Sequence, residues 1–514
     1  MKRIIGNTLN AHDHNWYDGD VHYQAERHSR YKMNLYNTCY HDYYLNHVKD
    51  RLADSNVITS FSYTLGGVRI GNYPSGEHPF DTSLKKYHDA ILNHDESFKN
   101  LWDHYHEENF YYINHHQSHA AYALISSQYE ESDVLVTDGG GIGYNAIFFD
   151  RTGKVYNLSD EMPLGWLWNV CCISTKLSAR DSGKLMGAAG YGKPNSKLYD
   201  ILELLIGQFQ LFGKEYAIAE NFISQVSGIT IYDLAATIQQ FTLDKIKECV
   251  IPLKTSDNLC VAGGVAYNGY MNELFTKYYK NVYVPPAPGD EGQSIGNYIH
   301  AEYVLNKKKH LPRIYNGLDY ATLDEELLQG LTYEKKDISI IQKEVANSIS
   351  EGAIVGWFQG RSESGNRALG NRSIVADPRN PDIKNIINHT IKFREDFRPF
   401  APSVLEEHYR EWFDTNQSSP HMSRIMPVIE EKKAIVPGIT HVDGTARIQT
   451  VTVDQNDRWY GLINEFYKIT GVPMLVNTSF NCREPIVETP LNAINTFKKT
   501  NLDILVINDY IITK

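Results

Sequence analysis

Cysteine and long apolar runs are both scarce in this chain. Its 514 residues include only six cysteines, and the one close pair, Cys171 and Cys172, is adjacent in sequence. Such a set forms no disulfide framework, and we expect a reduced, cytoplasmic compartment. No run approaches the roughly 18 apolar residues of a membrane span. The first residues, MKRIIGNTLNAHDHN, contain only a very short apolar run. We therefore expect no signal peptide and no membrane partner.

Positive charge is also in deficit. Lys and Arg number 50 against 62 acidic residues, which gives a net charge of −12. Proteins that coat nucleic acid non-specifically need a positive surface, so this balance argues against that class and leaves only a local basic cleft open. Hydrophobic residues make up 42% of the chain, which is ordinary for a globular protein with ample core. The length predicts two or three domains.

The pattern along the chain predicts an α/β fold. Short apolar runs alternate with glycine turns and helix-like segments over the first two-thirds. A charged, polar stretch at 306–330 is typical of a linker, and the pattern restarts near residue 340. We predict two domains, 1–325 and 326–514. Within the first we expect a β-hairpin over 132–150, a strand, glycine turn and helix over 258–275, and a strand, proline-rich loop and helix over 282–305.

Three histidines lie close together in INHHQSHAAYAL, residues 113–124. On a helix, His115 and His119 project from one face because they are four residues apart, and their imidazoles can converge on one ion. His116 points elsewhere. By itself such a pair fits either a metal site or a solvated or core-packed coincidence, and the spacing does not separate the two.

The familiar phosphate-binding loops are absent, since no GxxxxGK[ST] or GxGxxG sequence occurs. Glycine turns after strands are present instead, and a backbone without a Cβ can approach phosphate oxygens closely. Each turn alone is typical of a structural role. The candidate nucleotide-binding residues in these turns are Gly139, Gly140 and Gly141 after Asp138, then Gly183 and Lys184 in DSGKLMGAAGYGKP, and Gly263, Gly264 and Asn268 in GGVAYN.

Taken together, two glycine turns that each leave a strand resemble those that flank a nucleotide in the actin, sugar-kinase and heat-shock ATPase superfamily. In that arrangement Asp138, at a strand end, and Asp290, in a later loop, would join the histidine pair. A shell of two imidazoles and two carboxylates suits Fe(II), Mn(II) or Zn(II) better than Mg(II), which prefers oxygen ligands and water.

Residues 360–403 are unusually basic for so acidic a chain. A solvated basic face is the simplest explanation of such a run. We favour an anion site, because Arg367 and Arg372 lie among glycines and Arg398 lies beside a rigid Pro-Phe-Ala-Pro turn. Guanidiniums held on such frames suit bidentate recognition of a small phosphate. The basic residues of this stretch are Arg361, Arg367, Arg372, Arg379, Lys384, Lys392, Arg394 and Arg398.

A series of motifs resembles one family. HHQSHAAYA, DGGGIGYNAIF, SGKLMGAAGYG, VAGGVAYNGYMN, VPPAPGDEGQSIG, GRSESGNRALGNRSI, FREDFRPFAPS and PMLVNTSFN occur in the order found in the O-carbamoyltransferases of antibiotic and nodulation-factor biosynthesis. The resemblance covers the whole chain. It implies a duplicated, actin-like (ribonuclease-H-like) α/β domain followed by an α/β domain that resembles threonylcarbamoyl-AMP synthases and forms carbamoyl-adenylate.

The resemblance implies a two-step reaction. The C-terminal domain would activate carbamoyl phosphate with ATP to give carbamoyl-adenylate and pyrophosphate. The N-terminal domain would bind the adenylate at a divalent metal, with Fe2+ ahead of Mn2+, Zn2+ and Mg2+, and pass the carbamoyl group to an acceptor hydroxyl. By position in the motifs, the resemblance implies that the metal ligands are His115, His119, Asp138 and Asp290. It implies that the carbamoyl phosphate residues are Arg367, Lys392, Arg398, Arg447, Asn477 and Ser479, and that Lys32 lies near the bound phosphates. His12 would be the base that takes the acceptor's proton, and Asp13 would orient it.

The sequence departs from the family pattern in two places. The segment after Asp13, HNWYDGDVHY, replaces a pattern of small residues, and NTSFNCREPIV lacks a glycine before Glu484. The first departure lies where the acceptor would dock, so the acceptor stays open between a sugar hydroxyl of a secondary metabolite and the hydroxymethyl group of a nucleotide or DNA base such as 5-hydroxymethylcytosine. A homodimer also stays open. The alternative function is a kinase or ATPase of the actin-like superfamily, which leaves the histidine pair and the arginines without a role.

Overall fold

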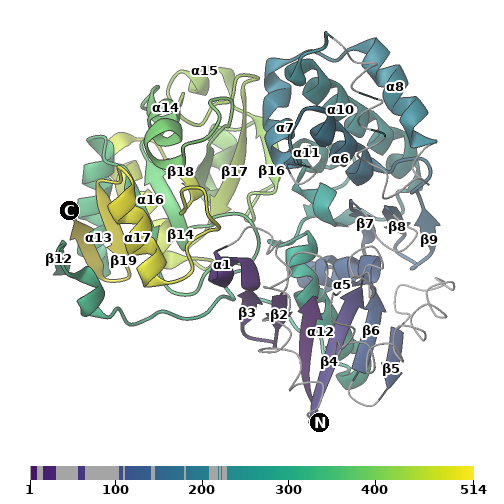
Figure 1. The fold of residues 1–514 in the computed structure, drawn as a ribbon, viewed down its shortest axis with the longest axis horizontal. Helices are drawn as coiled ribbons and strands as arrows, with labels where there is room; N and C mark the ends of the chain where they lie inside the picture. Colours follow the sequence, from purple (N-terminus) through teal and green to yellow (C-terminus); the bar gives the residue numbers. More distant parts are fainter. Residues whose placement is uncertain are drawn as a thin grey trace, which may run out of the picture.

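The computed structural model shows a mixed α/β protein built on three β-sheets (Figure 1). Strands from the first 283 residues form two of the sheets, and strands between residues 332 and 513 form the third, which lies beside them. Among the residues described, no helix combines the length and apolar character needed to cross a bilayer. The structure describes residues 2–8, 15–30, 56–63, 104–107, 110–139, 145–178, 181–207, 218, 222 and 228–514.

The first sheet has the strand order β3-β2-β1-β4-β6-β5. β1, β2 and β3 pair antiparallel in succession, whereas β4 and β6 are added in parallel on the other side of β1. The strands are β1 (Arg3–Thr8), β2 (Asn15–Tyr17), β3 (His22–Gln24), β4 (Val57–Tyr63), β5 (His104–Glu107) and β6 (Phe110–Asn114).

The second sheet repeats this arrangement, with the order β11-β10-β7-β8-β9. β7, β8 and β9 again pair antiparallel in succession, and β10 and β11 are added in parallel beyond β7. Numbered within each half, the second sheet has the order 3-2-1-4-5 and the first has 3-2-1-4-6-5, in which β6 takes the fifth place and β5 is an added antiparallel edge strand. This shared arrangement confirms the duplicated actin-like fold that we expected, and the β7–β8 pair confirms the hairpin over 132–150. The strands are β7 (Asp133–Thr137), β8 (Ala146–Phe149), β9 (Val155–Asn157), β10 (Asn258–Ala262) and β11 (Asn281–Tyr283).

Two buried helices lie between these sheets and pack against each other. α12 (Gln293–Asn306) packs on β1 and β4 of the first sheet, and α5 (His115–Ser127) packs on β7 and β10 of the second. Because β6 leads directly into α5, the histidine motif begins where a strand of the first sheet ends. Among the residues described, this half also contains α6 (Leu164–Ser174), α7 (Ser182–Ala188), α8 (Ser196–Ile206), α10 (Ile231–Lys245) and α11 (Gly269–Phe275), besides a short helix near the N-terminus.

The third sheet has nine strands in the order β12-β20-β19-β13-β14-β18-β15-β17-β16 and carries its own apolar core. α13 (Ile338–Ser350) buries Ile341, Val345 and Ile349, which recur on one helical face, and packs against α16 (Asp457–Thr470). The other helices are α14 (Ile383–Ile387), α15 (Glu430–Lys433) and α17 (Pro490–Lys499). The strands are β12 (Thr332–Lys335), β13 (Val355–Phe358), β14 (Arg372–Ala376), β15 (Ala401–Leu405), β16 (Arg424–Pro427), β17 (Thr445–Val451), β18 (Met474–Ser479), β19 (Ile504–Ile507) and β20 (Tyr510–Thr513).

A short N-terminal helix, α1 (Ala25–Ser29), joins the first half of the chain to the third sheet (Figure 1). Arg27 on this helix is fully buried, donates to the carbonyl of Gly365 (2.7 Å) and lies 3.5 Å from Glu488. Arg30 donates to the carbonyls of Pro485 (2.8 Å) and Ile486 (2.7 Å). The N-terminal segment therefore fixes loops of the C-terminal half.

We expect His22, next to this helix, to make the stability of the protein sensitive to acid. Its ring is buried and lies 2.9 Å from the hydroxyl of Ser364, and burial, with the charge of Arg27, lowers its pKa to about 3. Because the folded pKa lies below the unfolded value, neutral His22 contributes stability above pH 6.5 that is lost as the pH falls toward 3. We expect the melting temperature of the wild type to fall more between pH 7 and pH 5 than that of His22→Gln, by differential scanning fluorimetry. Equal pH dependence of the two would contradict this.

Candidate active site

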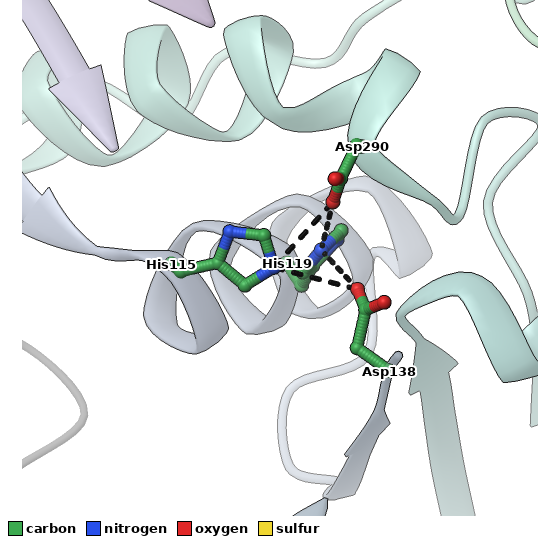
Figure 2. Close-up of side chains that lie close together, drawn as sticks. All are labelled: His115, His119, Asp138 and Asp290. Carbon is green, nitrogen blue, oxygen red and sulfur yellow. Dashed lines mark hydrogen bonds and ion pairs between the residues drawn. The ribbon is translucent and has the colours of Figure 1, made fainter. Parts of the chain in front are cut away.

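Four side chains from three segments meet at the strand ends between the two actin-like sheets (Figure 2). His115 is the first residue of α5 and His119 lies one turn later, while Asp138 directly follows β7. Asp290 begins a 3-10 turn, Asp290–Gly292, that leads into α12. One ligand atom from each residue lies within 4.8 Å of the others. The structure thus brings together all four residues predicted as metal ligands.

The contacts within this cluster are short. His119 Nε2 lies 3.0 Å from Asp138 Oδ2 and 3.3 Å from Asp290 Oδ1, and His115 Nε2 lies 3.4 Å from each carboxylate. Both imidazole rings are buried, and their centroids are 4.8 Å apart. Two imidazole nitrogens and two carboxylate oxygens that converge in this way fit a divalent transition metal.

Helix capping and a neighbouring amide fix His115. Asn114 caps α5 in a reciprocal capping box with Gln117, so the helix starts at His115. This start places the His115 side chain in the cluster. The amide of Gln293 lies 2.7 Å from His115 Nδ1, on the ring atom that does not face the carboxylates. Contacts of this kind orient imidazole ligands in metal sites.

The protonation of the cluster follows from its charges. Burial lowers the pKa of His119, but hydrogen bonds and the charges of Asp138 and Asp290 outweigh burial and raise it to about 9. Burial likewise raises the pKa of Asp138, but the two histidines hold it well below its usual range. His116 is not one of the four residues whose ligand atoms converge, and burial lowers its pKa to about 3, so it is neutral.

A cavity of about 420 Å³ opens beside the cluster. Asp138 and Asp290 line it, and so do four of the predicted nucleotide-binding residues, Gly139, Gly183, Gly264 and Asn268. The other lining residues include Trp168, Asn169 and Tyr267.

Close packing against β7 leaves no room for a side chain at Gly263. It has a φ of +89°, and a Cβ there would lie 2.2 Å from the carbonyl oxygen of Thr137. A side chain would force β10 away from β7, and with it the turn that faces Asp138. Gly263 itself is not among the residues that line the cavity.

A second cavity, of about 500 Å³, lies at the third sheet. Four arginines line it: Arg367, Arg394, Arg398 and Arg447. Asn477 and Ser479 on β18 line it as well, and Lys184 from α7 reaches it from the first half. The structure therefore brings together the predicted carbamoyl phosphate residues, apart from Lys392, around one space.

Positive charge is in excess in this second cavity, where four arginines and Lys184 face two acidic residues, Glu26 and Asp181. Among the residues described, neither Arg367 nor Arg447 forms an ion pair, and the Nε of each is buried without a hydrogen bond. Burial, followed by the charges of the three neighbouring arginines, holds the pKa of Arg447 well below its usual range. Arg398 has a weak partner, Glu395, at 3.6 Å. Such a cavity favours an anionic ligand.

Lys392 supports the wall of this cavity from behind. Its ammonium donates to the carbonyl of Ser479 and to Asn481 Oδ1 (2.6 Å). It ends a π-helical turn, Asn388–Lys392, and the next residue, Phe393, has a φ of +47°. Backbone strain of this kind at a bulky residue clusters at functional sites.

The rest of the basic stretch is structural, and this corrects our expectation for Arg372. Arg372 is fully buried in β14 and donates to the carbonyls of Gln359, Asn371, Gly360 and Glu488. Outside the cavity as well, Arg361 pairs with Asp20, Arg379 with Asp377, and Lys384 donates to the carbonyl of Thr440.

The two cavities share a wall. Gly183 and Met186 of α7 and the adjacent Asn366 and Arg367 line both of them. Arg367 lies over the ring of Tyr267 at 5.0 Å, and the hydroxyl of Tyr267 donates to Glu291, next to Asp290. Residues of α7 and the Asn366–Arg367 segment thus border both the arginine cavity and the cavity beside the histidine–aspartate cluster.

Five predicted site residues lie outside the described residues: His12, Asp13, Lys32, Gly140 and Gly141. Conversely, sequence reasoning did not assign Arg394 to the site, although it named this residue within the basic stretch. No sequence signal could have found it, because its place in the cavity follows from the positive φ of Phe393, which only the structure shows.

Comparison with known proteins defines the class. A model described as the carbamoyltransferase N-terminus matches residues 80–299, and one described as the carbamoyltransferase C-terminus matches residues 346–514. The chain belongs to the carbamoyltransferase family, as the resemblance predicted.

Three relatives with names show which carbamoyltransferases this chain is similar to. It is 35% identical to the nodulation protein NolNO of Sinorhizobium fredii over 78% of this chain and 64% of that protein. It is 34% identical to the nodulation protein NolO of Bradyrhizobium diazoefficiens over 78% of this chain and 79% of that protein. The 3'-hydroxymethylcephem-O-carbamoyltransferase of Streptomyces clavuligerus is 29% identical over 59% of this chain and 58% of its own length.

Similar solved structures align only loosely. HypF of T. kodakarensis matches with a TM-score of 0.27 and 12% identity over 57% of this chain and 47% of its own. The activator of 2-hydroxyisocaproyl-CoA dehydratase from Clostridium difficile matches with a TM-score of 0.30 and 11% identity, over 58% of this chain and 92% of its own.

Proposed function

We propose that this protein is an ATP-dependent O-carbamoyltransferase that works in two steps. The observation that carries the proposal is the shared wall between an arginine-lined cavity and a histidine–aspartate cluster. The site that binds the anionic substrates and the site that transfers the carbamoyl group would then be adjacent and share lining residues. An unstable intermediate could pass between them without meeting bulk water.

In the first step the arginine cavity would hold carbamoyl phosphate and the phosphates of ATP. A carbamate oxygen attacks the α-phosphorus of ATP, the bond to the β-phosphate breaks, and carbamoyl-adenylate and pyrophosphate form. Atom balance requires that water cleave the phosphate of carbamoyl phosphate and that inorganic phosphate leave. Arg367, Arg398 and Arg447 would bind the phosphates and offset the charge that builds during transfer.

In the second step the adenylate would lie in the first cavity. Gly139, Gly264 and Asn268 would approach its phosphate and nucleoside. A divalent metal held by His115, His119, Asp138 and Asp290, with Fe2+ the ion we favour, would supply Lewis-acid polarisation there. The acceptor oxygen attacks the carbamoyl carbon, AMP leaves, and the hydroxyl proton goes to a base, for which His12 is our candidate.

The acceptor is a small molecule with a free hydroxyl in this proposal. One relative is named for a hydroxymethyl group on a cephem, which suggests a hydroxyl of a secondary metabolite, and a sugar hydroxyl is the acceptor that we favour. A hydroxymethyl group on a nucleotide or DNA base is the alternative acceptor.

The test is mass spectrometry of the purified protein incubated with ATP and carbamoyl phosphate, with and without divalent metal and without acceptor. We expect carbamoyl-adenylate and pyrophosphate from the wild type, and neither from Arg398→Ala, because this variant loses a cation of the second cavity. Acceptor candidates are then screened for a gain of the mass of HNCO. ATP converted only to ADP and phosphate, regardless of carbamoyl phosphate, would support the kinase alternative and overturn the proposal.

A further inference from the structure

Tyr267 contacts residues of both cavities. It lines the cavity beside the histidine–aspartate cluster, a few residues after the Gly263–Gly264 turn. The guanidinium of Arg367, which lines both cavities, lies over its ring, with Arg367 Cζ 5.0 Å from the ring centroid. The hydroxyl of Tyr267 donates to Glu291 Oε1. One side chain therefore has a ring contact with an anion-binding residue and a hydrogen bond to the segment that carries a metal ligand.

Glu291 closes the turn that carries Asp290. Its carboxylate folds back over this turn, because Glu291 Oε1 also accepts from the backbone N–H of Gly289 at 3.0 Å. Asp290 lies between these two residues in the chain, so the hydrogen bond fixes the backbone on both sides of the ligand. The packing is close: a Cβ at Gly289 would lie 2.7 Å from Glu291 Oε2 and 3.3 Å from Tyr267 Cε2. The hydroxyl of Tyr267 thus binds the carboxylate that shapes the turn.

Arg367 depends on the ring of Tyr267 because it has few other contacts. Among the residues described, Arg367 forms no ion pair, and its Nε is buried without a hydrogen bond. A guanidinium over an aromatic ring is attracted by the negative face of the ring, which leaves its N–H groups available for a phosphate. An acidic partner in the same place would compete with an anionic ligand, whereas the ring does not.

We propose that Tyr267 is a positioning residue with two separable roles. Its ring holds Arg367 for the anionic substrate, and its hydroxyl, through Glu291, holds the turn that presents Asp290 to the metal. Tyr267 takes no part in a chemical step, since it acts through residues that touch the substrate or the metal. The inference rests on the proposed function, which assigns the ligands of the two sites.

The role of the hydroxyl is tested by metal binding alone. Isothermal titration calorimetry measures the Mn2+ affinity of the intact protein. We expect binding about 10-fold weaker in Tyr267→Phe and weakened at least as much in Glu291→Ala, because loss of contacts that support a ligand has an effect of this order. The variant with both substitutions should bind Mn2+ as Glu291→Ala does, since the hydroxyl acts through this carboxylate.

The role of the ring is tested by binding of carbamoyl phosphate without nucleotide or metal. Tyr267→Phe keeps the ring, so its affinity should stay within about 2-fold of the wild type. Tyr267→Leu loses the ring and should bind carbamoyl phosphate about 3–30-fold more weakly. Tyr267→Met replaces Tyr267→Leu if that variant does not fold.

Tyr510→Phe is the matched control. The hydroxyl of Tyr510 also donates to a glutamate, Glu325, at 2.7 Å, but Tyr510 lines neither cavity. Its loss should leave the affinities for Mn2+ and for carbamoyl phosphate unchanged.

The outcomes distinguish this inference from the proposed function. Wild-type Mn2+ affinity in Tyr267→Phe overturns the role of the hydroxyl, and unchanged carbamoyl phosphate affinity in the variant without the ring overturns the role of the ring. Equal weakening of both ligands in Tyr267→Phe overturns the separation of the two roles. In each of these cases the wild type still binds Mn2+ and carbamoyl phosphate, and the proposed function stands. A wild type that binds neither overturns the proposed function and the inference with it.

Discussion

His119→Ala is expected to lose its divalent metal and its carbamoyl transfer while keeping the ability to form carbamoyl-adenylate. His119 contributes one of four converging ligand atoms, and its Nε2 lies closest to Asp138, at 3.0 Å. Loss of supporting contacts alone weakens metal sites about 10–100-fold, so loss of a ligand should weaken this one by more than about 100-fold. Metal analysis after dialysis and transfer assays with preformed carbamoyl-adenylate measure the two losses.

The neighbouring histidine provides the control for that variant. His116 lies on the same buried turn of α5 but is not one of the four residues whose ligand atoms converge, so His116→Gln should retain the metal. Pyrophosphate release from ATP and carbamoyl phosphate should continue in both variants, because the arginine cavity is untouched. Loss of pyrophosphate release in folded His119→Ala would contradict a division of the reaction between two sites.

Arg447→Met should be more stable than the wild type and nearly inactive in the activating step. Arg447 shares one cavity with three other arginines and, among the described residues, forms no ion pair. Removal of its charge relieves repulsion, and we expect a melting temperature a few degrees higher, equivalent to roughly 0.5–2 kcal/mol. The same charge is needed to hold an anionic substrate, so kcat/KM for carbamoyl phosphate should fall by about 10²–10³.

Arg372→Met is the contrasting variant. Arg372 comes from the same basic stretch, but it donates to four backbone carbonyls and lies 3.6 Å over the ring of Phe358. Its loss leaves buried carbonyls unpaired, and destabilisation by about 3 kcal/mol or more is expected. Thermal unfolding of the two variants, with carbamoyl phosphate present and absent, gives the comparison. A fall in stability of Arg447→Met without ligand would contradict the role of Arg447 as an unbalanced anion-binding charge.

The pair of arginines also illustrates why sequence patterns stop short of a site. Arg367 and Arg372 occur in nearly identical glycine-containing surroundings, GNRALGNRS, and both suggested a phosphate site. The chain between them turns into β14, which carries Arg372 into the sheet interior and leaves Arg367 at the wall of the cavities. Local pattern specifies that a guanidinium is present, whereas strand direction specifies what it faces.

Arg394 and Asn477 show a similar limit. Nothing near Arg394 in sequence distinguishes it from the basic residues around it, and its place in the cavity depends on the reversal at Phe393. The orientation of the Asn477 amide depends on hydrogen bonds to Ala368, Ser403 and Gln449, which come from three other segments of the third sheet and its loops. No spacing rule connects these positions.

The sequence by itself determined the local elements and the kinds of side chain available. Periodicity and glycine turns were enough to predict the β7–β8 hairpin, the strand–turn–helix at 258–275 and the helical histidine pair, because hydrogen bonds between near neighbours fix such units. Only the tertiary structure decided which units meet. The repeated strand order brings Asp138 and Asp290 to the histidines, and the docking of α7 between the two halves makes one wall serve two cavities, because contacts between distant segments depend on packing of the whole chain.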